Sequence, residues 1–190
     1  SRTATIKKKK IYMEYFVLPE SRPGAEGLMN KAEKYLEFYT NVFGTYPWKN
    51  EKFGIAQTPY LGMEHQTIIA YGNNYKETKM GYDKLLLHEM GHEWWGNFLS
   101  ISDWSDFWIP EGFTTYAEAL YIEQNFGMSA YHAFMENTCR KNILNSRPLV
   151  PNQNATTDQI KGSDFYYKGA YVLHMLRYLV GYDVLIQTLR

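Results

Sequence analysis

The segment His88-Glu89-Met90-Gly91-His92 constrains this chain more than any other part of its sequence. If residues 83–96 form a helix, His88 and His92 lie one turn apart and project from the same face. Two imidazoles at this spacing can hold one metal ion, with Glu89 beside them to act on a metal-bound water. The spacing therefore predicts a helix over 83–96 with a metal site on one face.

Glu111 is the expected third ligand. Eighteen residues lie between His92 and Glu111. Pro110 precedes it, which is typical of a helix start, and a carboxylate in a first turn can point outward. Two histidines, one glutamate and an open fourth position are typical of a catalytic zinc site, whereas structural zinc sites are closed. The sequence therefore predicts one zinc ion held by His88, His92 and Glu111.

Length and charge limit the function classes that remain. A chain of 190 residues is long enough for one domain with a hydrophobic core. Twenty basic residues balance twenty acidic ones, so we expect no nucleic-acid partner. No stretch approaches the roughly twenty apolar residues of a membrane span. Cys139 is the only cysteine, which excludes an internal disulfide but leaves the compartment open.

Apolar periodicity and turn residues predict the other elements. Strands are expected over 5–18, 53–57 and 66–71, and a turn over 19–24. A helix over 26–43 is predicted by one apolar stripe, followed by Gly44: Leu28, Ala32, Tyr35, Leu36, Tyr39 and Val42. Further helices are expected over 111–125, 129–145 and 163–180, with a loop over 148–157. Strands first and helices afterwards indicate an α+β fold, a small sheet followed by a mainly helical part.

Four segments carry a resemblance to a known family. They are Gly62-Met63-Glu64, HEMGHEWWGN (88–97), WSDFWIPEGFTTYAE (104–118) and Tyr166-Tyr167-Lys168-Gly169. Together and in this order they resemble the aminopeptidase N family of zinc aminopeptidases, within the gluzincin metallopeptidases. The resemblance implies a thermolysin-like zincin catalytic domain.

The resemblance also implies roles for particular residues. Glu89 would take a proton from the zinc-bound water as general base and pass it to the leaving amine. Tyr166 matches the family's catalytic tyrosine, which would share the negative charge of the tetrahedral intermediate. Tyr167 is the rival, because neighbouring helical side chains point about 100° apart and only one can reach the metal.

Gly62, Met63 and Glu64 match the family's exopeptidase motif, so the resemblance implies that they bind substrate. A free α-amino group, with a pKa of about 7.7–8.0, is largely protonated near neutral pH. Glu64 would pair with it and place the first peptide bond over the zinc. We therefore expect peptides with a free N-terminus as substrates. His65 stands where the family has asparagine.

Members of the family are several times longer than this chain. By comparison, residues 1–19 resemble the closing strand of an N-terminal β domain, and residues 20–190 a thermolysin-like catalytic domain. The rest of the β domain and a C-terminal helical domain are then the missing partners of this chain. We expect apolar surface that faces them to be exposed, self-association of the isolated chain, and low activity.

Two alternatives to a zinc aminopeptidase stay open. One is a gluzincin endopeptidase, or a related hydrolase that acts on a non-peptide substrate. The other is a non-catalytic scaffold that keeps a zinc site for folding or binding. Glu64, Glu89 and Tyr166 disfavour the scaffold, because structural zinc requires none of them.

Overall fold

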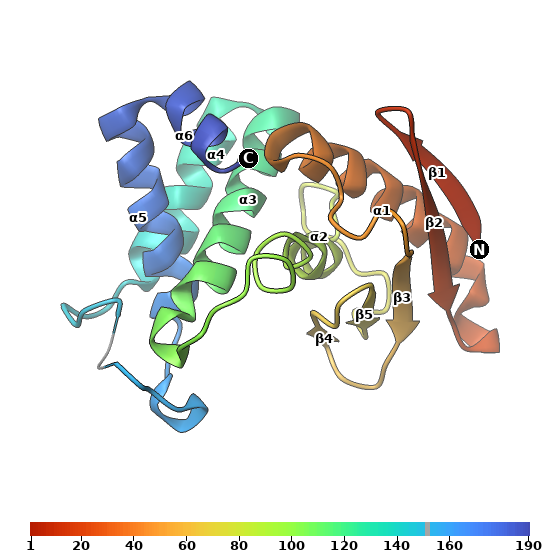
Figure 1. Ribbon diagram of the computed structural model, residues 1–190, viewed down its shortest axis with the longest axis horizontal. Helices are drawn as coiled ribbons and strands as arrows, with labels where there is room; N and C mark the ends of the chain where they lie inside the picture. Colours follow the sequence, from red (N-terminus) through yellow and green to blue (C-terminus); the bar gives the residue numbers. More distant parts are fainter. Residues whose placement is uncertain (151–152) are drawn as a thin grey trace. The chain divides into compact units, whose positions relative to one another are not determined.

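A computed structural model of the chain describes residues 1–150 and 153–190. Its contacts divide the chain into two compact units, Ser1–Phe98 and Leu99–Arg190. The first unit holds a sheet and two helices, and the second is helical (Figure 1). Each unit is described by itself.

The sheet of the first unit has the strand order β1-β2-β3-β5-β4. β1 (Arg2–Ile6) and β2 (Lys9–Phe16) form an antiparallel hairpin. β3 (Phe53–Gln57) is parallel to both β2 and β5 (Ile68–Tyr71). The two-residue strand β4 (Gly62–Met63) is antiparallel to β5 at the edge of the sheet. The segment that resembles the exopeptidase motif therefore begins on an edge strand.

Helices α1 (Arg22–Phe43) and α2 (Lys84–Gly91) pack against each other in this unit. Every member of the predicted apolar stripe of α1 is buried, which confirms that helix and its core face. Gly44 ends α1 at φ 100°, a left-handed value that favours glycine. Burial of this stripe is what fixes α1 over the sheet and α2.

The N-terminal predictions need two corrections. The single strand expected over 5–18 is a hairpin, because Lys7 and Lys8 turn the chain at φ 46° and 66°. Such turns usually carry Asn or Gly, so two lysines gave no turn signal. The helix expected from residue 26 begins at Arg22, after a 3₁₀ turn over Pro19–Ser21. Proline tolerates the first helical turn, so Pro23 does not delay the helix.

The second unit contains α3 (Trp108–Phe126), α4 (Met128–Phe134), α5 (Asp164–Val180) and α6 (Tyr182–Thr188). α5 confirms the helix predicted over 163–180. The predicted helix over 129–145 is shorter, because α4 passes into a π-helical turn, Met135–Cys139, and then a 3₁₀ turn, Arg140–Asn142. α6 was not predicted. Of the loop predicted over 148–157, residues 151 and 152 lie outside the described residues.

The α+β class predicted from the sequence is confirmed: a small mixed sheet comes first and helices follow. None of the helices in the described residues combines the length and the apolarity that crossing a membrane requires. The strands over residues 2–16 pair with β3 in one sheet. The assignment of residues 1–19 to a separate β domain stays a prediction.

Candidate metal centre

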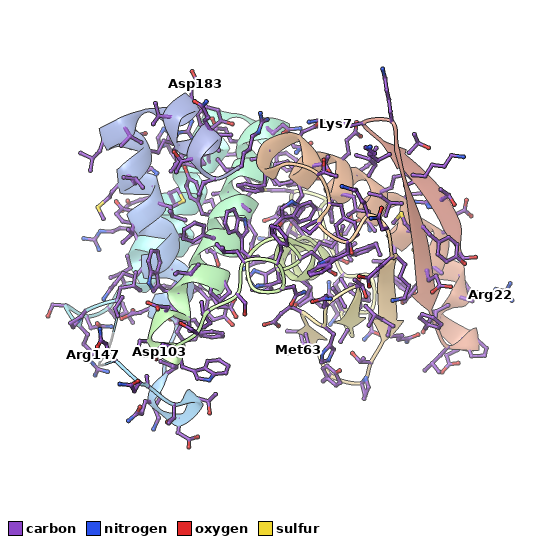
Figure 2. The ribbon with its side chains drawn as sticks, in the orientation of Figure 1. Lys7, Arg22, Met63, Asp103, Arg147 and Asp183 are labelled. Atoms are coloured by element: carbon purple, nitrogen blue, oxygen red, sulfur yellow. The ribbon has the colours of Figure 1, made fainter. Side chains whose placement is uncertain are left out.

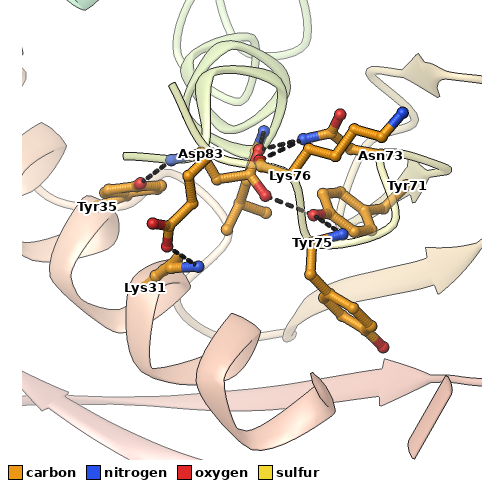
Figure 3. A network of polar contacts seen from close by, with 9 residues as sticks. Lys31, Tyr35, Tyr71, Asn73, Tyr75, Lys76 and Asp83 are labelled. Atoms are coloured by element: carbon orange, nitrogen blue, oxygen red, sulfur yellow. Dashed lines mark hydrogen bonds and ion pairs between the residues drawn. The ribbon is translucent and has the colours of Figure 1, made fainter. Parts of the chain in front are cut away.

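Helix α2, which carries His88 and Glu89, begins at a buried polar network around Asp83 (Figure 3). The Asp83 carboxylate accepts hydrogen bonds from Leu86 N at 3.1 Å, from Asn73 Nδ2 at 2.9 Å and from the Tyr71 hydroxyl. Its backbone N–H donates to the Tyr35 hydroxyl at 2.9 Å. Burial and the neighbouring Asp83 raise the pKa of the Tyr71 hydroxyl. The start of α2 is thus fixed by side chains from α1, β5 and the loop after β5.

His88 and His92 converge as their spacing predicts. Their Nε2 atoms lie 3.2 Å apart, and their rings meet edge to face. α2 ends at Gly91, earlier than the predicted 96, but His92 keeps helical angles (φ −63°, ψ −18°) and so stays on the same face. His92 Nδ1 lies 2.9 Å from the carbonyl of Trp95, a contact that orients the ring with Nε2 toward His88. Two converging Nε2 atoms, one of them on a ring that a backbone carbonyl orients through Nδ1, fit a zinc ion.

The carboxylate of Glu89 is buried beside the backbone of β4. A Cβ atom placed on Gly62 would lie 2.7 Å from Glu89 Oε1 and 2.9 Å from Leu85 Cδ1. Gly62 is therefore needed for its lack of a side chain, which lets the edge strand approach Glu89. The next residue, Met63, is 42% exposed and is labelled at β4 in Figure 2.

Glu64 joins the same cluster. One ligand atom from each of Glu64, Glu89 and His92 can be chosen so that all three lie within 4.8 Å of one another. The carbonyl of Glu64 accepts a hydrogen bond from Asn97 Nδ2 at 3.0 Å. Two carboxylates from separate segments of the chain thus meet beside His92, that of Glu64 half-buried and that of Glu89 buried.

Sequence reasoning missed Glu93, which directly follows His92 and has no solvent exposure. Burial raises the pKa of this carboxyl to about 7, against hydrogen bonds from Thr67 and Asn97 that lower it. The signal in the sequence was a charged residue inside the aromatic run His92-Glu93-Trp94-Trp95, where a solvent-facing residue is hard to place. The two tryptophans are themselves buried, with Trp94 stacked on Tyr39 at 5.1 Å.

The remaining predicted site residues lie in the second unit. Glu111 is buried in the first turn of α3, which begins at Trp108 and not at residue 111. Tyr166 and Tyr167 are both half-buried on α5, with ring centroids 6.3 Å apart. α3 and α5 approach closely at Gly112 and Gly169, next to Glu111 and three residues after Tyr166. The ligand role of Glu111 and the choice of Tyr166 over Tyr167 stay predictions.

Comparisons with known proteins agree on one family. The model of the peptidase family M1 domain matches residues 28–190. Endoplasmic reticulum aminopeptidase 2 of Bos taurus is 27% identical over 189 residues, covering 88% of this chain and 19% of that protein. Aminopeptidase N of Oryctolagus cuniculus is 27% identical over 174 residues, covering 78% of this chain and 18% of its own length. The chain thus spans about a fifth of the length of these curated relatives.

A solved structure agrees with them. The M1 zinc metallopeptidase of Deinococcus radiodurans superposes with a TM-score of 0.77 at 26% identity, over 100% of this chain and 41% of that one. The family predicted from the four motifs is confirmed, and with it the zincin fold. The chain belongs to peptidase family M1.

Proposed function

We propose that this chain is the catalytic part of a zinc aminopeptidase that hydrolyses the N-terminal peptide bond of peptides. The observation that carries the proposal is the meeting of Glu64, Glu89 and His92 within 4.8 Å. A hydrolytic zinc site needs one carboxylate as its base. A second carboxylate beside it suits a substrate that brings a positive charge to the reacting bond.

The proposed ligands are His88, His92 and Glu111, with one zinc ion per chain. The convergence of the two imidazoles supports the first two, and the family motif supports Glu111. Held there, zinc supplies a water of lowered pKa and polarises the scissile carbonyl. The contact between His92 Nδ1 and the Trp95 carbonyl presents the other ring nitrogen as the donor atom.

Glu89 acts as general base: its carboxylate takes a proton from the attacking water and gives it to the leaving amine. Its burial against Gly62 holds the carboxylate in one place and excludes water from one side. Tyr166 donates a hydrogen bond to the oxygen that becomes negative in the tetrahedral intermediate. Glu64 pairs with the α-ammonium group of the substrate and so aligns its first peptide bond. These roles make peptides with a free N-terminus the substrates.

Replacing the general base tests the proposal. Glu89→Gln should keep one zinc ion per chain and lower kcat by roughly 10²–10⁴-fold on aminoacyl anilides, because the amide cannot accept the proton. Zinc is measured by elemental analysis and turnover by release of the anilide. Glu37→Gln, an exposed position on α1, is the matched control and should keep both zinc and turnover. Normal hydrolysis by Glu89→Gln would overturn the assigned base.

The same assay separates the alternatives. An aminopeptidase cleaves free aminoacyl anilides and leaves their N-acetylated forms, whereas an endopeptidase cleaves both. A zinc-binding scaffold would bind the metal, lose it on chelation and cleave neither. Equal cleavage of both forms would remove Glu64 from its role and with it the aminopeptidase assignment.

A further inference from the structure

Glu93 is a fully buried carboxylate that the proposed chemistry does not use. Its Oε1 accepts a hydrogen bond from Thr67 N at 2.8 Å, and its Oε2 accepts one from Asn97 Nδ2 at 3.4 Å. Thr67 and Asn97 belong to the surroundings of Glu64, and the side chains of Tyr46 and Trp48 also face the Glu93 carboxylate. Burying a carboxylate is unfavourable unless hydrogen bonds compensate it, so the groups that donate to Glu93 are held against it.

Thr67, the first partner, has an unfavourable backbone conformation. Its φ is 61°, in the left-handed region that β-branched residues rarely occupy. It sits in a turn closed by the hydrogen bond from Ile68 N to the carbonyl of His65. Strain of this kind persists where the surroundings dictate the conformation, and it is concentrated at functional sites.

Contacts on both sides of Thr67 fix its backbone conformation. On one side Glu93 holds its N–H, and on the other its carbonyl accepts from Gly54 N at 2.7 Å and from Lys52 Nζ at 3.2 Å. Lys52 also lies 3.3 Å from the Thr67 hydroxyl. A Cβ on Gly54 would approach the Thr67 carbonyl to 2.6 Å, so this position also depends on glycine. The turn after Glu64 is therefore hydrogen-bonded both to β3 and to the segment after His92.

Asn97, the second partner, completes the arrangement. One amide nitrogen, Nδ2, donates both to Glu93 and to the carbonyl of Glu64, at 3.4 and 3.0 Å. Glu93 thus holds the segment 64–67 at both ends, directly at Thr67 and through Asn97 at Glu64. The Glu64 side chain belongs to one end of this segment and reaches the cluster with Glu89 and His92.

We propose that Glu93 is a positioning residue: through Thr67 and Asn97 it fixes Glu64 where the α-ammonium group of a peptide binds. This inference rests on the proposed function. It assigns the preference for a free N-terminus to the hydrogen-bonded set of Glu93, Asn97 and Thr67, here called the bracket, and not to Glu64 alone. Loss of the bracket lets the 64–67 turn relax, so Glu64 no longer meets the ammonium group at the fixed distance that selects it.

Peptide binding by a zinc-loaded but inactive protein tests the inference. In a Glu89→Gln background, calorimetry gives the Kd of trialanine and of N-acetyl-trialanine. Glu93→Ala and Asn97→Ala should each weaken binding of trialanine about tenfold, the size of one lost charge-assisted contact. Binding of the acetylated peptide and the zinc content should stay unchanged. Glu93→Gln keeps an acceptor for Thr67 N but presents an amide to Asn97, so its loss should be intermediate.

Three comparisons keep the result decisive. Leu28→Ala removes a buried side chain from α1 and should leave both Kd values unchanged; a loss as large as that of Glu93→Ala would reduce the effect to general destabilisation and overturn the inference. If Glu93→Ala does not fold, Asn97→Ala, which is half-buried, carries the same expectation alone. If Glu64→Gln removes the preference for trialanine but the Glu93 and Asn97 variants keep it, the inference fails and the proposed function stands. If Glu64→Gln leaves the preference intact, the proposed function fails.

Discussion

At the scale of single residues, two glycines set the distance between α3 and α5. A Cβ on Gly112 would lie 2.8 Å from Gly169 Cα, and one on Gly169 would lie 3.0 Å from Gly112 Cα. Both neighbours are backbone atoms, which cannot move without moving a helix. Glu111 and Tyr166 lie on these two helices, so the glycine contact fixes how the proposed ligand and the proposed oxyanion donor approach each other.

Gly112→Ala should therefore push the two helices apart. We expect a loss of about 1–3 kcal/mol in the free energy of unfolding, the usual cost of overpacking, and a fall in kcat. Urea unfolding and anilide hydrolysis measure the two effects. Gly27→Ala is the matched control, because Gly27 is also helical but its Cβ would meet nothing within 4 Å. That change should stabilise the chain by about 0.4–1 kcal/mol. Equal effects at both positions would show that the glycine contact is not tight.

At the scale of elements, Asp103 holds the loop that contains Asn154 and Ala155 at the start of the second unit by hydrogen bonds. It caps the 3₁₀ turn Trp104–Asp106, accepting from Ser105 N at 2.9 Å and from Ser105 Oγ at 2.8 Å. The backbone N–H groups of Asn154 and Ala155 also donate to it, at 2.5 and 3.1 Å. These hydrogen bonds, led by that from Ser105 N, lower the pKa of Asp103 to about 2.

The pH at which this loop detaches follows from that shift. An unfolded aspartate titrates near 3.9, so the Asp103 contribution to stability is complete above about pH 4 and is lost as the pH falls through 2. The amide resonances of Asn154 and Ala155 should therefore keep their neutral-pH positions down to pH 3 and shift only below it. Asp103→Asn should displace both resonances at neutral pH and abolish their titration. If these two resonances titrate with a midpoint near pH 3.9 in the unsubstituted chain, Asp103 does not hold the loop by these hydrogen bonds.

Helices and strands that are determined by residues close together in the chain could be predicted from the sequence. The apolar stripe of α1, the short run of β3 and the helix carrying Tyr166 follow from periodicity, and the structure has them within a few residues. The hairpin at Lys7 and Lys8 could not be predicted, because its turn contradicts the residue preference for positive φ. Packing of the sheet outweighs that local cost, and packing is not visible in a single sequence.

The candidate site shows the same division. The spacing of His88 and His92 predicts their convergence, since four residues on a helix determine it. The bracket of Glu93, Asn97 and Thr67 depends on contacts 26 and 33 residues apart in the chain. No periodic pattern encodes such contacts. The only sign of Glu93 in the sequence was a charge in an aromatic run, and burial was needed to interpret it.

At the scale of the whole molecule, the second unit leaves large apolar side chains exposed along α5 and α6. The largest exposed fractions there belong to Leu179 at 81%, Tyr178 at 64%, Val184 at 54% and Met175 at 49%. Monomeric proteins rarely expose contiguous apolar patches, because water contact with them is unfavourable. The chain also has no net charge at pH 7, so no electrostatic repulsion opposes association.

We therefore expect the 190-residue chain to associate with itself, increasingly so at higher concentration, through the exposed face of α5 and α6. Sedimentation velocity from 1 to 100 μM measures this as a rise in weight-average mass. Leu179→Lys should shift association to roughly tenfold higher concentration, because a lysine at the centre of an apolar contact must be desolvated. Leu144→Lys is the matched control, since Leu144 is 84% exposed but lies in the loop after Asn142 and is part of neither helix. Equal reduction by both changes would attribute association to net charge, because each adds one positive charge. A mass that stays monomeric at every concentration would show that this apolar face does not drive association.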